Sequence, residues 1–131
     1  MLSEQSVIAI VDDDRSFLDS MRRMLRSLGY DVAAFSSAAE LLASPKLPAS
    51  ACLVADVHMP AMSGVELYRH LIQIGRTIPT ILVTAYRDDS VRKRMLAEGV
   101  VCHLYKPLQE SDLIACLHSA LARGKAPPGT A

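Results

Sequence analysis

Five short apolar runs recur along the chain, and a segment with apolar residues every three or four positions follows each of them. The runs span 6–11, 31–35, 51–56, 79–84 and 100–105. Continuously apolar, β-branched runs of this length are typical of strands buried on both faces of a parallel sheet. The segments between them have the amphipathic pattern of helices. Five strands alternating with five helices predict an α/β fold, a three-layer αβα sandwich in which right-handed crossovers join parallel strands.

Polar caps and glycines mark the ends of the predicted helices. Asp14 is the expected N-cap of the first helix, and Ser37 with Glu40 has the spacing of a capping box that opens a short second helix. Glycines should stop the first, third and fourth helices, because they readily take the left-handed conformation found after helix ends. These glycines are Gly29, Gly75 and Gly99.

Length and composition fit one domain. The chain has 131 residues, of which 50% are hydrophobic and 21% charged, enough to bury a core without disulfides or metal ions. We expect this domain to cover residues 1–123. Residues 124–131, Gly-Lys-Ala-Pro-Pro-Gly-Thr-Ala, have nothing to bury and predict a flexible tail or interdomain linker.

The charge balance and the apolar stretches exclude two classes of partner. The 14 basic and 14 acidic side chains cancel, so the segment lacks the basic surface that direct nucleic-acid binding requires. No stretch approaches the ~20 apolar residues of a membrane span, and residues 1–7 lack the basic and apolar parts of a leader. We therefore expect a cytoplasmic protein that contacts neither nucleic acid nor membrane through this segment.

The three cysteines, Cys52, Cys102 and Cys116, are odd in number and show no Cys-x-x-Cys spacing. Their neighbours are apolar, which argues against both a disulfide framework and a zinc site. We expect all three to be thiols in the core of a protein that works in a reducing compartment.

Chemically capable side chains stand at the carboxyl ends of four of the five predicted strands. Asp12 and Asp13 follow the first strand, Asp56 ends the third, Thr84 ends the fourth and Lys106 follows the fifth. In an open parallel sheet these ends meet at one edge, where ligands bind. The sequence therefore predicts one site built from all five residues.

Three carboxylates this close would repel one another unless a cation neutralised them. A ligand set of oxygen atoms without His or Cys favours Mg²⁺, which binds one or two carboxylates and keeps several waters. We expect Asp13 and Asp56 to be direct ligands and Asp12 to act mainly through water, with Mn²⁺ as the expected substitute. Asp14 is left as the helix cap.

Asp56 is the predicted nucleophile of this site. Its free carboxylate oxygen can attack a phosphorus atom and form an aspartyl phosphate. The Lys106 ammonium, the Thr84 hydroxyl and the metal would then share the phosphoryl oxygens, since phosphoryl transfer needs positioning and charge neutralisation more than covalent help.

Four motifs in this order resemble the receiver domain of bacterial two-component response regulators, especially the FixJ-like branch. The resemblance covers roughly residues 6 to 122. Each motif alone is weak, but the four together, each at a strand end, are specific. They are Val11-Asp12-Asp13-Asp14, Asp56-x-x-Met59-Pro60-x-Met62-x-Gly64, Thr84-Ala85 and Lys106-Pro107.

The resemblance implies a flavodoxin-like sheet of receiver type, in the strand order 2-1-3-4-5. It also implies that Asp56 accepts a phosphoryl group from a phosphohistidine on a sensor histidine kinase. The backbone carbonyl of His58 would be a further metal ligand, and the peptide bond before Pro107 would be cis. Phosphorylation would switch the surface of helix four, strand five and helix five, and would favour a homodimer. The output, such as transcription, would be controlled through a DNA-binding domain outside this chain. The resemblance thus implies a signalling module with no enzyme activity beyond its own phosphotransfer and dephosphorylation.

The sequence departs from the receiver pattern three residues before the lysine. Receivers usually carry Tyr or Phe there, a ring that moves inward when the threonine shifts, whereas this chain has His103. A weaker, pH-sensitive or otherwise different switch is one expectation, because imidazole is smaller and titrates near neutral pH. A tolerated, half-buried histidine without a switching role is the alternative.

Three further positions are expected to tune the signal. In receivers, the residues two after the aspartate and two after the threonine govern how water reaches the acyl phosphate, and here they are His58 and Tyr86. Both are bulky, so we expect a long-lived phosphoryl group. Tyr105 should project beside helices four and five, on a surface where partners dock.

Two other readings of the acidic residues stay open at this point. Asp12-x-Asp14 after a first strand is similar to the nucleophile and acid of haloacid-dehalogenase-like phosphatases, although that fold usually needs a longer chain and leaves Asp56 unexplained. A flavin-binding flavodoxin-like protein would need a phosphate-cradling loop after the first strand, where this chain places acidic residues instead.

Overall fold

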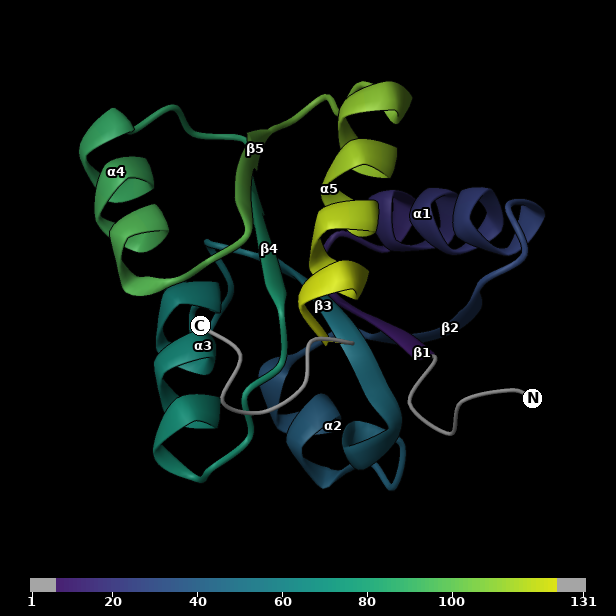
Figure 1. The fold of residues 1–131 in the computed structure, drawn as a ribbon, viewed down its shortest axis with the longest axis horizontal. Coiled ribbons are helices and arrows are strands. Elements are labelled where there is room, and N and C mark those ends of the chain that lie inside the picture. The colour runs from purple at the N-terminus through teal and green to yellow at the C-terminus, as the bar shows by residue number, and fades with distance from the viewer. Residues whose placement is uncertain (1–6, 125–131) are drawn as a thin grey trace.

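The structure is a computed structural model and describes residues 7–124. Its five strands form one parallel sheet in the order β2-β1-β3-β4-β5, which confirms the predicted fold and strand order (Figure 1). All but one residue of the predicted tail lie outside the described residues; the exception, Gly124, is the last residue of a helix. The strands are β1 (Val7–Val11), β2 (Asp31–Phe35), β3 (Ser50–Asp56), β4 (Thr80–Thr84) and β5 (Cys102–Tyr105).

Helices cover both faces of the sheet, as Figure 1 shows with the sheet between them. One core cluster packs α1 and α5 against the sheet, and a second packs α2, α3 and α4 against the other face. None of the helices in the described part of the chain is both long and apolar enough to cross a membrane. The helices are α1 (Arg15–Ser27), α2 (Ala38–Ala43), α3 (Gly64–Gln73), α4 (Asp89–Glu98), α5 (Glu110–Gly124) and the 3₁₀ turn η1 (Leu47–Ala49).

The helix caps explain why the loops at the carboxyl edge of the sheet are short. Asp14 caps α1 by accepting hydrogen bonds from two backbone N–H groups, as predicted. Ser37 caps α2, but the Glu40 carboxylate accepts from the N–H and hydroxyl of Ser36 instead of completing a capping box. The complete box lies at the start of α3, between Ser63 and Glu66.

The cysteines correct one sequence prediction. Cys102 on β5 and Cys116 on α5 are joined in a disulfide, with their Cα atoms 6.1 Å apart. Only Cys52 is a free, buried thiol, and burial raises its pKa to about 12. The pair escaped prediction because the two residues are 14 positions apart, and only the packing of α5 against the sheet brings them together.

Candidate functional site

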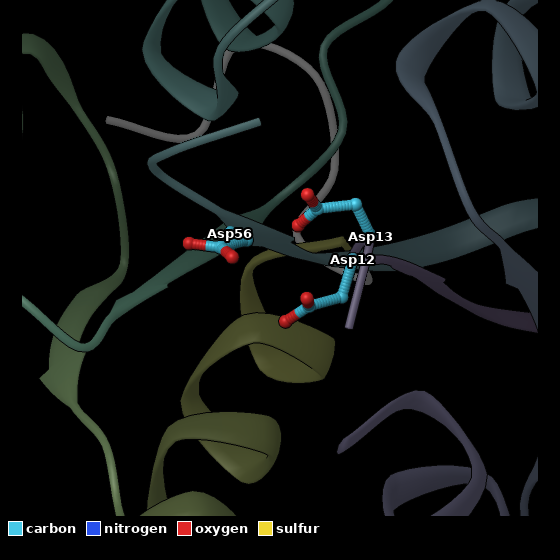
Figure 2. A group of neighbouring side chains, drawn as sticks. All are labelled: Asp12, Asp13 and Asp56. Atoms are coloured by element: carbon cyan, nitrogen blue, oxygen red, sulfur yellow. The ribbon is translucent and has the colours of Figure 1, made fainter. Parts of the chain in front are cut away.

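Three carboxylates meet where β1 and β3 end. Asp12 and Asp13 follow β1, Asp56 is the last residue of β3, and one oxygen from each lies within 4.8 Å of the others. Asp12 is fully buried, Asp56 is 6% exposed, and Asp13 is exposed. Figure 2 shows Asp12 and Asp13 extending from the end of β1 toward Asp56. This edge of the sheet thus carries a cluster of three carboxylates that is open to solvent on the side of Asp13.

The backbone around Asp56 is held from two directions. The N–H of the next residue, Val57, donates to the carbonyl of Val83 on β4 at 2.8 Å, and its own carbonyl accepts from the N–H of Gly64 at 3.0 Å. At Gly64 the first turn of α3 lies so close that a Cβ there would collide with the carbonyl of Asp56. The nucleophile predicted from sequence therefore sits on a fixed segment, and Gly64 permits the close approach.

Lys106 joins the two buried carboxylates. Its Nζ lies 2.8 Å from Oδ2 of Asp12 and 3.4 Å from Oδ2 of Asp56. The Lys106 N–H donates to the Thr84 carbonyl, and the peptide bond to Pro107 is cis, as the resemblance implied. The ammonium also lies 4.1 Å from the centre of the Phe17 ring. The sequence pattern does not predict this contact, because it joins α1 to the end of β5.

Burial and pairing oppose one another in the pKa values of this ion pair. Burial raises the pKa of Asp12, and the charge of Asp56 adds to this, although the hydrogen bond from Lys106 and its charge act in the opposite direction. Burial alone would lower the pKa of Lys106, but its bonds to Asp12 and Asp56 and their charges raise it. Lys106 is therefore a stable cation at neutral pH.

Asp12 is committed to protein donors on both oxygens. Its Oδ1 accepts from the N–H of Asp14 at 2.8 Å, and its Oδ2 accepts from Lys106. The exposed carboxylate of Asp13 has no such partners among the described residues. The two neighbouring carboxylates therefore differ: both oxygens of Asp12 are engaged by protein donors, and the Asp13 carboxylate is exposed.

Thr84, His58 and Tyr86 lie at the carboxyl ends of β3 and β4, the two strands that pair at Asp56. Thr84 is 1% exposed and its hydroxyl oxygen accepts from the N–H of Tyr86 at 3.0 Å. The N–H of His58 donates to Oδ1 of Asp56 at 3.1 Å. The rings of His58 and Tyr86 meet edge to face with their centres 4.9 Å apart, and Tyr86 is 67% exposed. The two bulky positions singled out from the sequence therefore form one aromatic pair.

His103 and Tyr105 lie on the face of β5 that is turned toward α4. His103 is 3% exposed, which corrects the picture of a half-buried ring, and neither ring nitrogen has a hydrogen-bond partner among the described residues. Burial lowers the pKa of His103. The Tyr105 hydroxyl donates to Asp89 at 2.8 Å and Arg87 stacks on its ring at 4.1 Å. Asp89 and Arg87 were not anticipated, because nothing in their spacing points to β5.

A cavity of about 410 Å³ lies next to these two rings. His103, Tyr105 and Arg87 line it, together with residues from the start of α4 and from the loop between β5 and α5. This agrees with the expectation that Tyr105 lies beside helices four and five, although its hydroxyl is engaged by Asp89.

Comparison with known proteins agrees with this geometry. The family model described as "Response regulator receiver domain" matches residues 8–118. The chain is 36% identical over 121 residues to the response regulator protein TmoT of Ectopseudomonas mendocina, covering 92% of this chain and 55% of the relative. It is 32% identical over 123 residues to nodulation protein W of Bradyrhizobium diazoefficiens, covering 94% and 54%. The chain thus spans about half the length of these curated relatives.

Among solved structures, the crystal structure of FixJ-N has a TM-score of 0.80 and 31% identity, and the alignment covers 93% of this chain and 96% of that one. Neither the family model nor these similar proteins support the phosphatase or flavodoxin alternatives. The family model covers far more than half of the sequence, and the strand order is the one expected for a receiver domain. The chain therefore belongs to the response regulator receiver domain family.

Proposed function

We propose that this domain accepts a phosphoryl group on Asp56 from a phosphohistidine of a sensor histidine kinase. The observation that carries the proposal is the position of the Lys106 ammonium. It contacts both Asp12 and Asp56 at the edge of the sheet where three carboxylates meet. Asp56 keeps its second oxygen outside this ion pair, where it accepts only the N–H of His58. It is thus held in place and still able to attack.

In the proposed transfer, an oxygen of Asp56 forms a bond to phosphorus while the bond from phosphorus to the kinase imidazole breaks. The imidazole leaves with that electron pair, and the product is an aspartyl phosphate. Lys106 moves from its carboxylate partners onto a phosphoryl oxygen, and the Thr84 hydroxyl donates to another. The protein thus positions the attacking oxygen and provides positive charge near the phosphoryl oxygens, which are the main requirements of this transition state.

The carboxylate cluster fits a hard divalent cation, because its donors are all oxygen and one side is open to solvent. We assign Asp13 and Asp56 as direct ligands of Mg²⁺ or Mn²⁺, the His58 carbonyl as a further ligand, and Asp12 as a ligand through water. When bound, the cation neutralises the negative charge that gathers around the phosphoryl group.

The length of the relatives supports a proposal about the output. The two curated relatives are about twice as long as the match and carry the names of a response regulator protein and a nodulation protein. We propose that this domain is joined to an output domain that controls transcription, in the cytoplasm. Phosphorylation would bias the surface of α4, β5 and α5 and favour a homodimer.

Acetyl phosphate labelling tests the phosphoacceptor. Asp56→Asn should abolish incorporation, because the amide is a poor nucleophile, and Asp19→Asn, on the exposed side of α1, should label like the wild type. Intact-mass measurement gives the result. Loss of labelling in Asp12→Asn with full labelling in Asp56→Asn would instead indicate the phosphatase chemistry.

The lifetime of the phosphoryl group is a separate proposal, supported by the contact between His58 and Tyr86. Tyr86→Ala should shorten the half-life of the aspartyl phosphate by roughly threefold, because water gains a path to the phosphorus. This change corresponds to a decrease of less than about 1 kcal/mol in the activation free energy of hydrolysis. Tyr30→Ala, at the start of β2 and far from Asp56, is the matched control. An unchanged or longer half-life in Tyr86→Ala would contradict the proposal.

A further inference from the structure

Two cysteines link the last strand to the last helix. Cys102 lies on β5, Cys116 lies on α5, and both belong to or pack on the core cluster between α1, α5 and the sheet. Cys116 is 7% exposed and Cys102 is partly exposed. Nothing in the proposed phosphoryl chemistry uses either of them.

The backbone holds this pair at a distance that suits a disulfide, in apolar surroundings. A separation of 6.1 Å between the Cα atoms lies within the usual range for disulfides of ~4.4–6.8 Å. The same positions suit two reduced thiols, which behave as small apolar side chains in a core. The third cysteine, Cys52, is buried, and its raised pKa of about 12 makes it inert to exchange. The chain thus holds one exchangeable pair and an internal reference thiol.

The pair is placed to act on the strand that carries the switch residues. Side chains alternate along β5, so Cys102 and Leu104 pack toward α5 while His103 and Tyr105 face the side of α4. Lys106 follows this strand directly. A covalent bond from Cys102 to α5 therefore restrains the strand that presents Lys106, His103 and Tyr105.

We propose that Cys102 and Cys116 are a reversible redox site, oxidised by a small-molecule disulfide such as oxidised glutathione, and that the disulfide opposes the response to phosphorylation. The second half of this statement rests on the proposed function of Asp56. The sign follows from the arrangement that the disulfide joins, in which Lys106 pairs with Asp12 and Asp56, whereas the proposed transfer moves Lys106 away from these carboxylates. A tether that fits this arrangement stabilises it against any other in which β5 shifts relative to α5.

The exchange balances as two successive thiol–disulfide steps. The more accessible thiol, Cys102, loses its proton, and its thiolate attacks a sulfur of oxidised glutathione, releasing one glutathione thiolate and forming a mixed disulfide. The Cys116 thiolate then attacks the Cys102 sulfur and releases the second glutathione thiolate. The two cysteines lose two electrons and two protons, and oxidised glutathione becomes two molecules of reduced glutathione.

Thiol trapping across a series of glutathione ratios tests the redox site without any phosphorylation. The native protein is equilibrated, quenched in acid, alkylated under denaturing conditions and measured by intact mass. Two of three cysteines should pass together from alkylated to protected as the oxidised form of glutathione increases, and the Cys52→Ala variant should give the same transition. Three alkylated cysteines at every ratio, or a transition that remains in Cys102→Ser, would overturn the proposal.

Binding of beryllofluoride, a mimic of the phosphoryl group, tests the coupling. Calorimetry should give an affinity about fivefold weaker for the oxidised than for the reduced protein, and beryllofluoride should shift the glutathione midpoint in favour of the thiols. In Cys102→Ser the affinity should not depend on the glutathione ratio. Equal affinities of the two wild-type forms would overturn the coupling. If neither form binds, the proposed function fails and the coupling with it, whereas the trapping result stands on its own.

Discussion

Gly64 shows how one missing side chain helps to determine the position of Asp56. A Cβ at this position would strike the backbone carbonyl of Asp56 and crowd the Cα of Val57. We expect Gly64→Ala to lower the free energy of unfolding by about 1–3 kcal/mol, because either α3 or the end of β3 must move. The displaced Asp56 should also be labelled more slowly by acetyl phosphate. Urea unfolding and intact-mass kinetics measure the two effects.

Gly29 provides the matched control. It has a φ of +95°, and no atom lies within 4 Å of the point that a Cβ would occupy, so Gly29→Ala introduces backbone strain without a collision. We expect a loss of about 1–2 kcal/mol from the left-handed conformation, with the labelling rate unchanged. A Gly64→Ala protein that is labelled at the wild-type rate would show that the close approach of α3 does not position Asp56.

The buried ring of His103 should make stability depend on pH. Burial lowers its pKa below the ordinary 6.5, the charge of Arg92 acts in the same direction, and Asp88 and Asp89 oppose both. The unfolded chain therefore takes up the proton first as the pH falls. The stabilisation is complete above about pH 6.5 and is lost as the pH falls toward the lowered pKa of the folded state.

We expect the free energy of unfolding to fall as the pH decreases from about 6.5 to about 5.5, a window above the ordinary range of the carboxylates. His103→Phe removes the titrating group and should flatten this dependence. Urea denaturation at several pH values provides the measurement. The same slope in His103→Phe and in the wild type would assign the pH dependence to another group.

At the scale of single residues, the sequence predicted which residues lie together at the site better than it predicted how deeply each one is buried. Asp12, Asp13, Asp56 and Lys106 could be placed together because each ends a strand, and parallel strands bring those ends to one edge. The burial of His103 could not be inferred in the same way. Alternation along β5 predicts the face on which a side chain lies, but the depth of burial depends on how the start of α4 covers that face.

Among the elements, α3 and α4 are connected by a contact that the periodic pattern does not reveal. The Tyr68 hydroxyl, on the buried side of α3, donates to the carbonyl of Glu98 at 3.0 Å, and Arg69 holds the Glu98 carboxylate with two nitrogens. Tyr68→Phe should cost about 1 kcal/mol of unfolding free energy, because the carbonyl loses its donor in a half-buried place. Thermal and urea unfolding measure this loss.

Arg69→Ala tests the same junction from its exposed side. Nearly half of the Arg69 side chain is accessible, so solvent screens its ion pair and we expect a loss below about 1 kcal/mol. If Arg69→Ala proved more damaging than Tyr68→Phe, the junction would depend on the surface ion pair and not on the buried hydroxyl.

The elements themselves were largely predictable, because continuous apolar runs and amphipathic segments differ clearly in this chain. The remaining differences are local. The strand expected at 100–105 begins at Cys102, since Val100 and Val101 lie in the turn that follows α4. The disulfide of Cys102 with Cys116 depends on how two elements pack, which neither pattern encodes.

For the whole molecule, a cation at the carboxylate cluster should add to the stability of the fold. The cluster takes its three oxygens from the ends of β1 and β3, so it exists only in the folded chain. At a Mg²⁺ concentration of about a hundred times the Kd, mass action should contribute about 2.7 kcal/mol. Thermal unfolding with and without Mg²⁺ measures the shift.

Asp13→Asn should abolish most of this shift while changing the stability of the metal-free protein little, because Asp13 is exposed. Asp19→Asn, an exposed carboxylate on α1, should keep the full shift. A Mg²⁺ effect that survives Asp13→Asn would place the cation elsewhere.

The ion pair of Lys106 has a consequence for synthesis of the protein. Lys106 is 94 positions after Asp12 and 50 positions after Asp56. A ribosome that has released β1 and β3 but not β5 exposes a chain with both carboxylates and no cation between them. Because the pairing needs nearly the entire domain, a kinase that recognises the assembled site would ignore nascent and truncated chains. Synthesis of this domain through β5 would then be a condition for the proposed phosphorylation.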